Sequence, residues 1–301
     1  MTVLEAIQKS AEFLGKKNVE SPRLQVELLL AHLLKMPRMK LYLNFERVLT
    51  STETDALREL VKRRGQREPL QHIIGSTSFC GYEIAVNRHA LVPRSETELF
   101  AEEGWKFLGE KETSVLDFGT GTGCIAIALA AKCPNAKIVA IDISADALAL
   151  AKQNVERNNV AARIEFLQGD GFAALQNRWG ERPREPKSNV QDGSPGVSPH
   201  QFDLIISNPP YIPSVEIETL QPEVRDFDPR AALDGGADGL DFYRKLATEA
   251  KLFLKPSGKI MLEFGDGQAD AIKKIFENEK WIVEAVKEDY SQRARILIAH
   301  H

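Results

Sequence analysis

The chain has 301 residues, of which 43% are hydrophobic and 27% charged, and its formal net charge at pH 7 is −4. That length is enough for one full-sized domain and a smaller one. No apolar run approaches the roughly 18 to 20 residues that a bilayer requires, which argues against a membrane-spanning class. The first residues lack the basic and apolar regions of a secretion signal, so we expect a cytoplasmic protein.

Cysteine and histidine usage argues against a metal site. The three cysteines, Cys80, Cys124 and Cys133, are an odd number without C-x-x-C spacing, which excludes the usual disulfide framework and zinc patterns. The six histidines show no ligand spacing either. We expect reduced thiols and no bound metal.

The first 75 residues carry helical signals. Apolar residues recur at helical spacing from Val3 to Leu14, which predicts a helix ending near Gly15. A second helix is expected to begin at Pro22 with Ser21 as its cap. Residues 50–53 have capping-box spacing, which predicts a third helix that ends at Gly65. Residues 1–75 are therefore expected to form a small all-α bundle.

A β-hairpin linker is expected next, over residues 76–93, because short β-prone stretches flank Gly81. From residue 94 to residue 301, strand-like and helical runs alternate, which predicts an α/β domain with a largely parallel sheet. Residues 177–201 interrupt this alternation with several prolines and glycines and no apolar period, so we expect a surface loop there. The expected strands are 115–118, 138–141, 164–167, 202–206, 260–264 and 296–299.

A glycine-rich turn follows the first of these strands. Gly119, Thr120, Gly121, Thr122 and Gly123 lead from strand 115–118 into an apolar helix that begins at residue 124. Glycines permit a tight turn and let a ligand approach main-chain amides at a helix start. The spacing differs from that of a P-loop and from the usual dinucleotide motif, so ATP hydrolysis is disfavoured.

An acidic residue at the next strand tip strengthens the prediction of a nucleoside site. Asp142 lies 19 positions after Gly123, where a carboxylate can accept hydrogen bonds from ribose hydroxyls. At the tip of the third strand, Asp170, Gly171 and Phe172 could contact an adenine base. The competing interpretation is a plain glycine turn with a helix-capping aspartate and an ordinary turn at 168–172.

The tetrapeptide Asn208, Pro209, Pro210 and Tyr211 follows the fourth strand. The prolines rigidify the backbone and remove amide donors, so the Asn208 side-chain oxygen and the Pro209 carbonyl can both accept from a substrate amino group. Tyr211 offers a flat face to a planar amide or base. The position after strand four favours this interpretation over a proline-rich turn.

With these motifs together, the chain resembles the class I S-adenosylmethionine methyltransferases with an Asn-Pro-Pro-Tyr motif, and among them the glutamine-N5 methyltransferases of peptide chain release factors. The resemblance covers nearly the whole chain and implies a Rossmann-like domain with a mainly parallel seven-stranded sheet. The segments that carry it, besides the glycine turn, are 67–75, 91–98, 202–212, 229–236, 238–240 and 262–265.

The resemblance also implies roles for particular residues. The glycine turn would hold the methionine part of S-adenosyl-L-methionine, Asp142 its ribose, and residues 170–172 its adenine. Asn208 and Pro209 would hydrogen-bond the substrate amide, and Tyr211 would pack on it. We also expect Asn208 to contact the cofactor. The helical domain would engage the release factor, and we expect a monomer with neither a membrane nor a nucleic-acid partner.

The chain departs from the family pattern in three places. Ser95 stands where the family usually has a second proline, Gly171 where an aromatic or larger residue is common, and the loop at 177–201 is much longer than usual.

Two alternatives compete with this interpretation. Adenine presents the same conjugated NH2 group, so a nucleic-acid amino methyltransferase (adenine N6) is one. Its expected basic recognition segments are missing apart from residues 58–67, which a solvated helix face explains. The other is a catalytically silent cofactor-binding protein, against which the intact Asn208 and Tyr211 argue.

Overall fold

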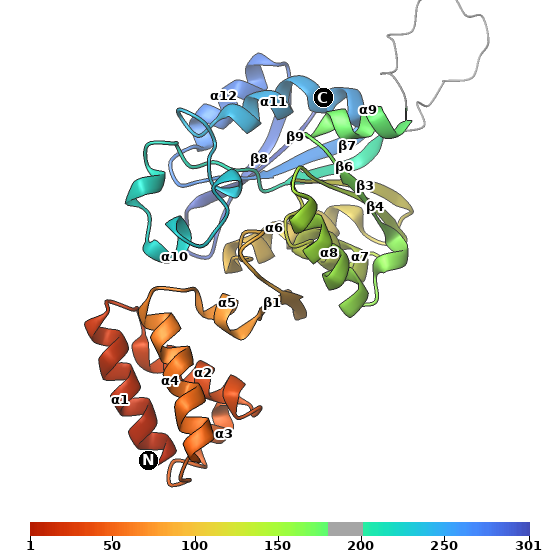
Figure 1. The fold of residues 1–301 in the computed structure, drawn as a ribbon. Helices are drawn as coiled ribbons and strands as arrows, with labels where there is room; N and C mark the ends of the chain where they lie inside the picture. Colours follow the sequence, from red (N-terminus) through yellow and green to blue (C-terminus); the bar gives the residue numbers. More distant parts are fainter. Residues whose placement is uncertain (180–200) are drawn as a thin grey trace, which may run out of the picture. The chain divides into compact units, whose positions relative to one another are not determined.

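The structure is a computed structural model that describes residues 1–179 and 201–301 (Figure 1). It divides into two compact units, a helical unit and a sheet unit. The helical unit comprises Met1–Thr77, Val86–Arg88 and Thr219–Asp228, and the sheet unit comprises Ser78–Ala85, His89–Glu218 and Pro229–His301. Most of the loop predicted at 177–201 lies outside the described residues. Its first three positions are helical instead, because α9 (Phe172–Trp179) continues through Trp179.

The helical unit is built from short amphipathic helices. Its elements are α1 (Val3–Lys16), α2 (Pro22–Leu33), α3 (Arg38–Tyr42), α4 (Ser51–Gly65), α5 (Leu70–Ile74) and α10 (Pro222–Arg225). The capping box predicted at Thr50 is confirmed, and Thr2 and Glu5 form a second one at the start of α1. These boxes satisfy backbone N–H groups that a helix start leaves without partners. The all-α bundle is confirmed.

The prediction that Ser21 caps α2 is wrong. Ser21 adopts a left-handed conformation with φ of 46° and its side chain makes no capping hydrogen bond. Capping requires an extended backbone that turns the hydroxyl back toward the helix amides, and the left-handed conformation does not provide it. Pro22 at the first helical position starts the helix without that bond.

An ion-pair cluster holds α10 in the helical unit. Glu223 accepts hydrogen bonds from Arg64 at 2.7 Å and from Arg67 at 2.6 and 2.7 Å. The Arg64 side chain is only 5% exposed, so its charge depends on this partner and on Gln25, whose oxygen accepts from Arg64 Nε at 2.8 Å. A segment that follows the Asn-Pro-Pro-Tyr motif by only a few residues is thereby part of the amino-terminal unit.

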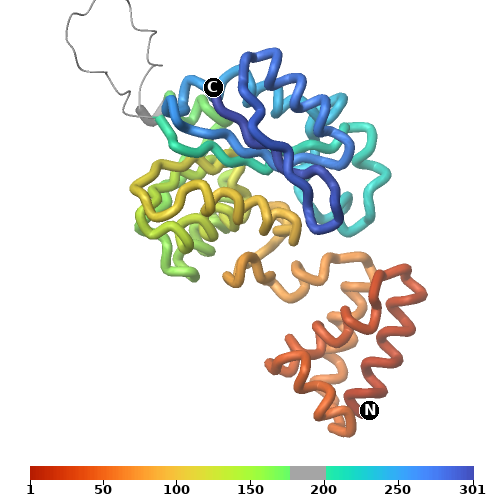
Figure 2. Tube along the Cα trace, turned by 180° about the vertical axis from the view of Figure 1, so that it is seen from behind, coloured from red at the N-terminus to blue at the C-terminus, as the bar shows by residue number. Residues whose placement is uncertain are grey.

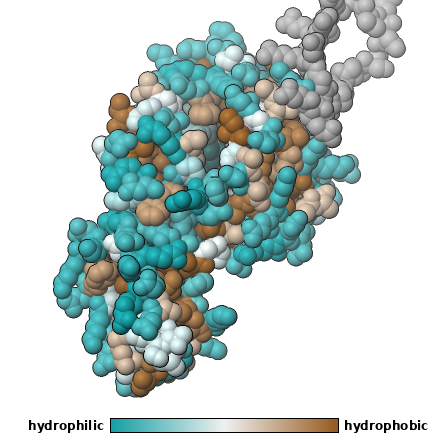
Figure 3. Space-filling view, in the orientation of Figure 1, coloured by the Kyte–Doolittle hydropathy of each residue, from teal (hydrophilic) through white to brown (hydrophobic). Residues whose placement is uncertain are grey.

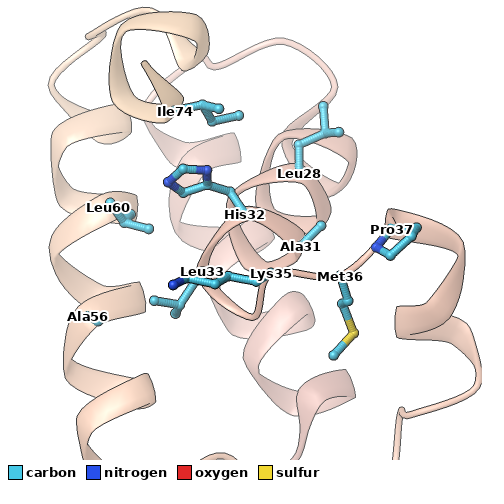
Figure 4. A pocket seen from close by; sticks show the side chains of 10 residues that line it. All are labelled: Leu28, Ala31, His32, Leu33, Lys35, Met36, Pro37, Ala56, Leu60 and Ile74. Carbon is cyan, nitrogen blue, oxygen red and sulfur yellow. The ribbon is translucent and has the colours of Figure 1, made fainter. Parts of the chain in front are cut away.

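The helical unit also contains a cavity of about 830 Å³. Figure 4 shows that its lining comes from α2, α4 and the segments beside them. The lining residues are Leu28, Ala31, His32, Leu33, Lys35, Met36, Pro37, Ala56, Leu60 and Ile74. None of the residues of the glycine turn or of the Asn-Pro-Pro-Tyr motif is among them.

The sheet unit contains a seven-stranded sheet with strand order β5-β4-β3-β6-β7-β9-β8. Its strands are β3 (Thr113–Phe118), β4 (Ala136–Asp142), β5 (Ile164–Gln168), β6 (Phe202–Ser207), β7 (Leu254–Glu263), β8 (Ile282–Glu288) and β9 (Ala294–His300). β5, β4, β3, β6 and β7 pair in parallel, and β9 pairs antiparallel with both β7 and β8. The predicted mainly parallel seven-stranded sheet is confirmed.

Helices cover both faces of this sheet. They are α6 (Ser95–Leu108), α7 (Cys124–Lys132), α8 (Ala145–Arg157), α9, α11 (Asp241–Glu249) and α12 (Ala269–Asn278), with short 3-10 turns η1 (Ala161–Arg163), η2 (Ile217–Thr219), η3 (Arg230–Ala232) and η4 (Ala250–Phe253). Figure 1 shows α6, α7 and α8 on one side and α9, α11 and α12 on the other, and Figure 2 shows the same layers from behind. One large apolar core joins α9, α11 and α12 to the strands.

A separate two-stranded sheet forms the predicted hairpin, with β1 (Ser76–Phe79) and β2 (Tyr82–Ala85). Its two-residue turn, Cys80 and Gly81, has positive φ at both positions, 51° and 84°. This conformation matches the right-handed twist of a hairpin and favours glycine at the second position.

The surface is mostly hydrophilic on the face that Figure 3 shows, where hydrophobic residues form small scattered groups. Within residues 1–179 and 201–301, no helix combines the length and apolar character that crossing a bilayer demands.

Candidate active site

The glycine turn between β3 and α7 is held by the neighbouring strand. The amides of Gly119 and Thr120 both donate to the Ile141 carbonyl at 2.9 Å. Gly119, Gly121 and Gly123 have φ of +77°, +56° and +78°, a region that L side chains rarely adopt. A Cβ at Gly119 would meet nothing within 4 Å, and one at Gly121 only the Cβ of Ala90 at 3.9 Å. There is open space directly beside the backbone of the turn, as a ligand-binding turn requires.

The third glycine has a structural role. A Cβ at Gly123 would lie 3.1 Å from the Cβ of Ala151 on α8, so Gly123 allows the turn and α8 to approach closely. Thr122 is buried and its carbonyl accepts from the Asn154 side chain at 2.9 Å. Gly123 and Thr122 therefore fix the turn, while Gly119 and Gly121 face the open space.

A buried carboxyl group holds the glycine turn by a hydrogen bond. Asp117 of β3 is fully buried and accepts a hydrogen bond from the Thr120 hydroxyl at 2.6 Å. Burial raises the pKa of Asp117 to about 7, against the opposing effects of the hydrogen bonds from Thr120 and from the amide of Ala126. The sequence reasoning did not single out this residue, although an acidic residue inside an otherwise apolar strand is itself a signal.

Asp142 lies where the sequence places it, at the carboxyl end of β4 and next to the turn. Its carboxylate accepts from the amide of Gly121 at 2.9 Å and from the amide of Ser144 at 2.9 Å. The first of these bonds ties Asp142 to the middle of the glycine turn. Its contact with a ribose stays a prediction.

Residues 170–172 differ from one another in their surroundings. Asp170 is exposed and pairs with Lys245 at 2.6 Å. Gly171 has φ of +59°, and a Cβ there would lie 2.7 Å from the Phe118 ring, so the packing of Phe118 leaves no room for a side chain at this position. Phe172 is fully buried and its ring stacks on Phe253 with a centroid distance of 4.7 Å. Phe172 is thus a core residue, and the adenine contacts of this segment stay predictions.

The Asn208 side chain is held by two residues that the sequence reasoning did not select. Its Nδ2 donates to Glu263 Oε1 at 2.9 Å and lies 3.4 Å from Thr97 Oγ1. Glu263 stands at the carboxyl end of β7 and Thr97 in the first turn of α6. Since Nδ2 is engaged, Oδ1 is the atom of this amide left to accept a hydrogen bond from a substrate.

The prolines and Tyr211 are enclosed by glycines from a later loop. A Cβ at Gly235 would lie 2.9 Å from the Pro210 carbonyl oxygen, and one at Gly239 would lie 2.3 Å from the Tyr211 carbonyl oxygen. That Tyr211 oxygen accepts from Gln268 Nε2 at 2.8 Å. Burial, with the nearby Glu263 charge, raises the pKa of Tyr211, so its phenol stays neutral at physiological pH. The motif is a rigid, close-packed loop.

The two predicted sites lie at the same edge of the sheet. β3 and β6 are adjacent parallel strands, so their carboxyl ends meet, and ligands in open α/β sheets bind at that edge. The Ser207 hydroxyl donates to the Phe118 carbonyl at 2.6 Å, which joins the residue before Asn208 to the residue before Gly119. The structure therefore brings the glycine turn and the Asn-Pro-Pro-Tyr motif together.

Two family profiles match this chain. One, described as "PrmC N-terminal domain", matches residues 5–75, and the other, described as "Methyltransferase domain", matches residues 109–297. The first falls on the helical unit and the second on most of the sheet unit.

The chain is similar along most of its length to curated relatives. The release factor glutamine methyltransferase of Geobacter sulfurreducens is 42% identical over 275 residues, covering 91% of this chain and 88% of the relative. That of Chlorobaculum tepidum is 38% identical over 276 residues, covering 89% and 87%. The solved hMettl16 catalytic domain, in complex with MAT2A 3′UTR hairpin 1, has a TM-score of 0.52 at 16% identity and covers 83% of this chain and 80% of that one. At that identity the structural likeness shows the fold alone.

Proposed function

This chain belongs to the family of release factor glutamine methyltransferases, and from that premise we propose that it transfers a methyl group from S-adenosyl-L-methionine to the side-chain amide nitrogen (N5) of the glutamine in the Gly-Gly-Gln motif of peptide chain release factors. The observation that carries the proposal is the fixed Asn208 amide, which presents an acceptor for an NH2 group beside the glycine turn.

The residues of the turn fit the proposed cofactor. Gly119 and Gly121 leave open space beside the backbone, and α7 begins directly after the turn, where the partial positive charge of a helix start favours a carboxylate. S-adenosyl-L-methionine would supply an electrophilic methyl group on a sulfonium. Asp142, at the end of β4 and bonded to the Gly121 amide, would be the carboxylate that accepts hydrogen bonds from the ribose hydroxyls.

The acceptor side of the reaction falls to Asn208 and Pro209. Asn208 Oδ1 and the Pro209 carbonyl would each accept a hydrogen bond from the substrate NH2 group, which turns the nitrogen lone pair toward the methyl carbon. Tyr211, neutral and close-packed, would bound the planar amide on one side. Holding the two reactants in line would lower the barrier. As the N–CH3 bond forms, the S–CH3 bond of the sulfonium would break and leave a neutral thioether, and the extra proton on nitrogen would then pass to solvent.

The nucleic-acid alternative is not favoured. The two relatives described above, each covering about nine tenths of the chain, are named release factor glutamine methyltransferase. The helical unit, which matches the amino-terminal domain of that family, is the part we propose to engage the release factor, with the whole protein acting as a monomer.

The acceptor is tested by label transfer. Purified enzyme and labelled S-adenosyl-L-methionine are offered an unmethylated release factor, its Gly-Gly-Gln variant with the glutamine replaced by glutamate, and duplex DNA in parallel. We expect label on the native factor alone. Label on DNA alone would overturn the protein-substrate proposal and leave the cofactor proposal standing.

The cofactor is tested by calorimetry with S-adenosyl-L-methionine. Asp142→Ala should weaken binding about tenfold or more, because charge-assisted hydrogen bonds contribute about 1.5–3 kcal/mol. Asp146→Ala, which removes a carboxylate that is 72% exposed in the first turn of α8, is the matched control and should bind as the wild type does. An unchanged dissociation constant for Asp142→Ala would remove the ribose assignment.

A further inference from the structure

Glu263 is a buried acid whose side chain pairs with Asn208 of the Asn-Pro-Pro-Tyr motif, called the acceptor motif from here on, and with Thr97. The residue is 4% exposed, and its Oε1 accepts from Asn208 Nδ2 at 2.9 Å and from the Thr97 hydroxyl at 3.1 Å. Its second oxygen, Oε2, is buried without a hydrogen-bond partner among the described residues. Burying a carboxyl group costs stability unless it is well paired, so packing of the core does not explain an acid at this position.

The orientation of the Asn208 amide explains it. An asparagine side chain can turn by 180° and exchange its oxygen and nitrogen at almost no cost in shape. Only one of these orientations presents Oδ1 to a substrate NH2 group, while the other presents a donor that repels it. An ionised carboxylate only accepts hydrogen bonds. It therefore pairs with Nδ2 of the asparagine, which donates, and repels Oδ1, which is itself an acceptor.

We propose that Glu263 is a positioning residue for methyl transfer, whose carboxylate fixes the Asn208 amide with Nδ2 toward β7 and Oδ1 toward the substrate amide. The inference rests on the proposed function and adds to it a residue that does not itself touch the reacting atoms. Thr97 assists by donating to the same carboxylate oxygen, so the oxygen carries two donors.

Several titratable or charged groups surround Glu263. Glu96 of α6 raises its pKa and Arg295 of β9 lowers it, while burial is the largest effect and the pKa of Glu263 is raised to about 7. Tyr211 and Tyr243 also lie near it, but burial raises the pKa of each above 10. Both phenols therefore stay neutral between pH 6 and pH 8.5, and Glu263 is the group among these whose charge changes in that range.

The proposal predicts a definite pH dependence. Protonated Glu263 carries a donor as well as acceptors, so it can pair with either end of the Asn208 amide and no longer selects one orientation. Turnover under saturating cofactor and acceptor should therefore rise as the pH increases through about 7. Glu263→Gln, which also carries both a donor and an acceptor, should remain at the low-pH activity of the wild type across the range.

The experiment measures kcat, KM and cofactor affinity of four variants between pH 6 and pH 8.5. Glu263→Leu should lower kcat about tenfold or more, the cost of a lost buried hydrogen bond, with unchanged affinity for S-adenosyl-L-methionine. Glu263→Gln should lose the rise of kcat with pH. Glu96→Gln should shift that rise to lower pH, because it removes a charge that raises the pKa of Glu263. The control is Glu284→Gln, which changes an exposed acid of β8 that pairs with Lys259 of β7. This variant should match the wild type.

The outcomes distinguish a failure of the Glu263 positioning role from a failure of the proposed methyltransferase function. Wild-type kcat in Glu263→Leu, or a pH rise in Glu263→Gln equal to that of the wild type, would overturn the positioning role while methyl transfer itself stands. A wild-type enzyme that labels no release factor would overturn the proposed function instead. If Glu263→Leu does not fold, the nearly isosteric Glu263→Gln still decides the matter through its pH profile.

Discussion

The glycine turn and the acceptor motif end neighbouring strands, β3 and β6, yet they are built from different parts of the chain. The turn presents main-chain amides and open space, and its shape depends on left-handed φ values at Gly119, Gly121 and Gly123. The acceptor motif presents one side-chain amide, Asn208, whose orientation depends on a buried acid from another strand. We therefore expect cofactor binding at the first to depend on backbone conformation, and methyl transfer at the second to depend on side-chain pairing.

That difference predicts which substitutions affect binding and which affect turnover. At the turn, any side chain that enters the open space should act on cofactor affinity. At the acceptor motif, a change in one polar atom should act on kcat and leave cofactor affinity unchanged. The following substitutions test this separation, from the largest expected effect to the smallest.

Asn208→Ala should lower methyl transfer by about 100-fold or more, since orientation of the reacting nitrogen is lost. Its affinity for S-adenosyl-L-methionine should stay within about twofold of the wild type, because the glycine turn is untouched. Transfer kinetics and calorimetry on the same preparation check both. Substantial activity in the variant would contradict the acceptor role, and a large loss of cofactor affinity would show that the two regions are not separable.

Alanine substitutions at two glycines of the turn should act differently. In Gly119→Ala the new Cβ meets no protein atom within 4 Å, so it enters the ligand space and should weaken cofactor binding about tenfold, with about 1 kcal/mol of backbone strain. In Gly123→Ala the Cβ lies 3.1 Å from Ala151, which should add a further 1–3 kcal/mol loss of folding stability. Denaturant unfolding and calorimetry measure the pair. Equal stability of the two variants would refute the structural role of Gly123.

Asp117→Asn should change how stability depends on pH. The pKa of the folded-state carboxyl is about 7, above its value of roughly 4 in the unfolded chain. Between these values the folded state binds the extra proton, so wild-type stability decreases as the pH rises toward 7 and levels off above it. The variant lacks this loss. The stability of the variant minus that of the wild type should therefore be about 2–3 kcal/mol more favourable at pH 8 than at pH 5. Urea unfolding without cofactor checks this, and an equal difference at both pH values would argue against a raised pKa.

Asp170→Ala should have the smallest effect. The carboxylate is exposed and paired with Lys245, so a hydrogen bond that it accepts from an adenine amino group should contribute about 1 kcal/mol. Its removal should lower cofactor affinity roughly fivefold. Asp241→Ala removes another exposed, ion-paired carboxylate of the same unit and serves as the control. Identical affinities for the two variants would exclude Asp170 from the cofactor site.

The sequence predicts the parts of the fold that repeat a local rule. Buried parallel strands such as 138–141 are continuous apolar runs, and the capping box at Thr50 is a local signal that the structure confirms. Strand β8 was not predicted, because Ile282–Glu288 carries charges and lies mostly exposed at the sheet edge. The start of β7 was predicted too late, at 260 instead of Leu254, because Pro256 and Gly258 within it resemble a turn.

The candidate site, too, could be predicted from the sequence only where its signals are local. The glycine turn and Asn208 carry their signals in adjacent residues, and the structure brings them together at one sheet edge. Thr97 and Glu263 lie in segments 91–98 and 262–265, which carry the family resemblance, but no local pattern predicts their pairing with Asn208, because it joins residues 111 and 55 positions apart. The strand order, with β6 beside β7, brings Glu263 to Asn208, and the packing of α6 brings Thr97 there; neither is a local property of the sequence.

The central claim is that the methyl group reaches a glutamine side-chain nitrogen under the control of Asn208. The most direct test reacts an unmethylated release factor with the wild type and with Asn208→Ala, digests each product, and locates the label by tandem mass spectrometry. The account predicts one methyl group on the Gly-Gly-Gln side-chain amide with the wild type and almost none with the variant. A methyl group on another residue, or equal amounts from both enzymes, would contradict it.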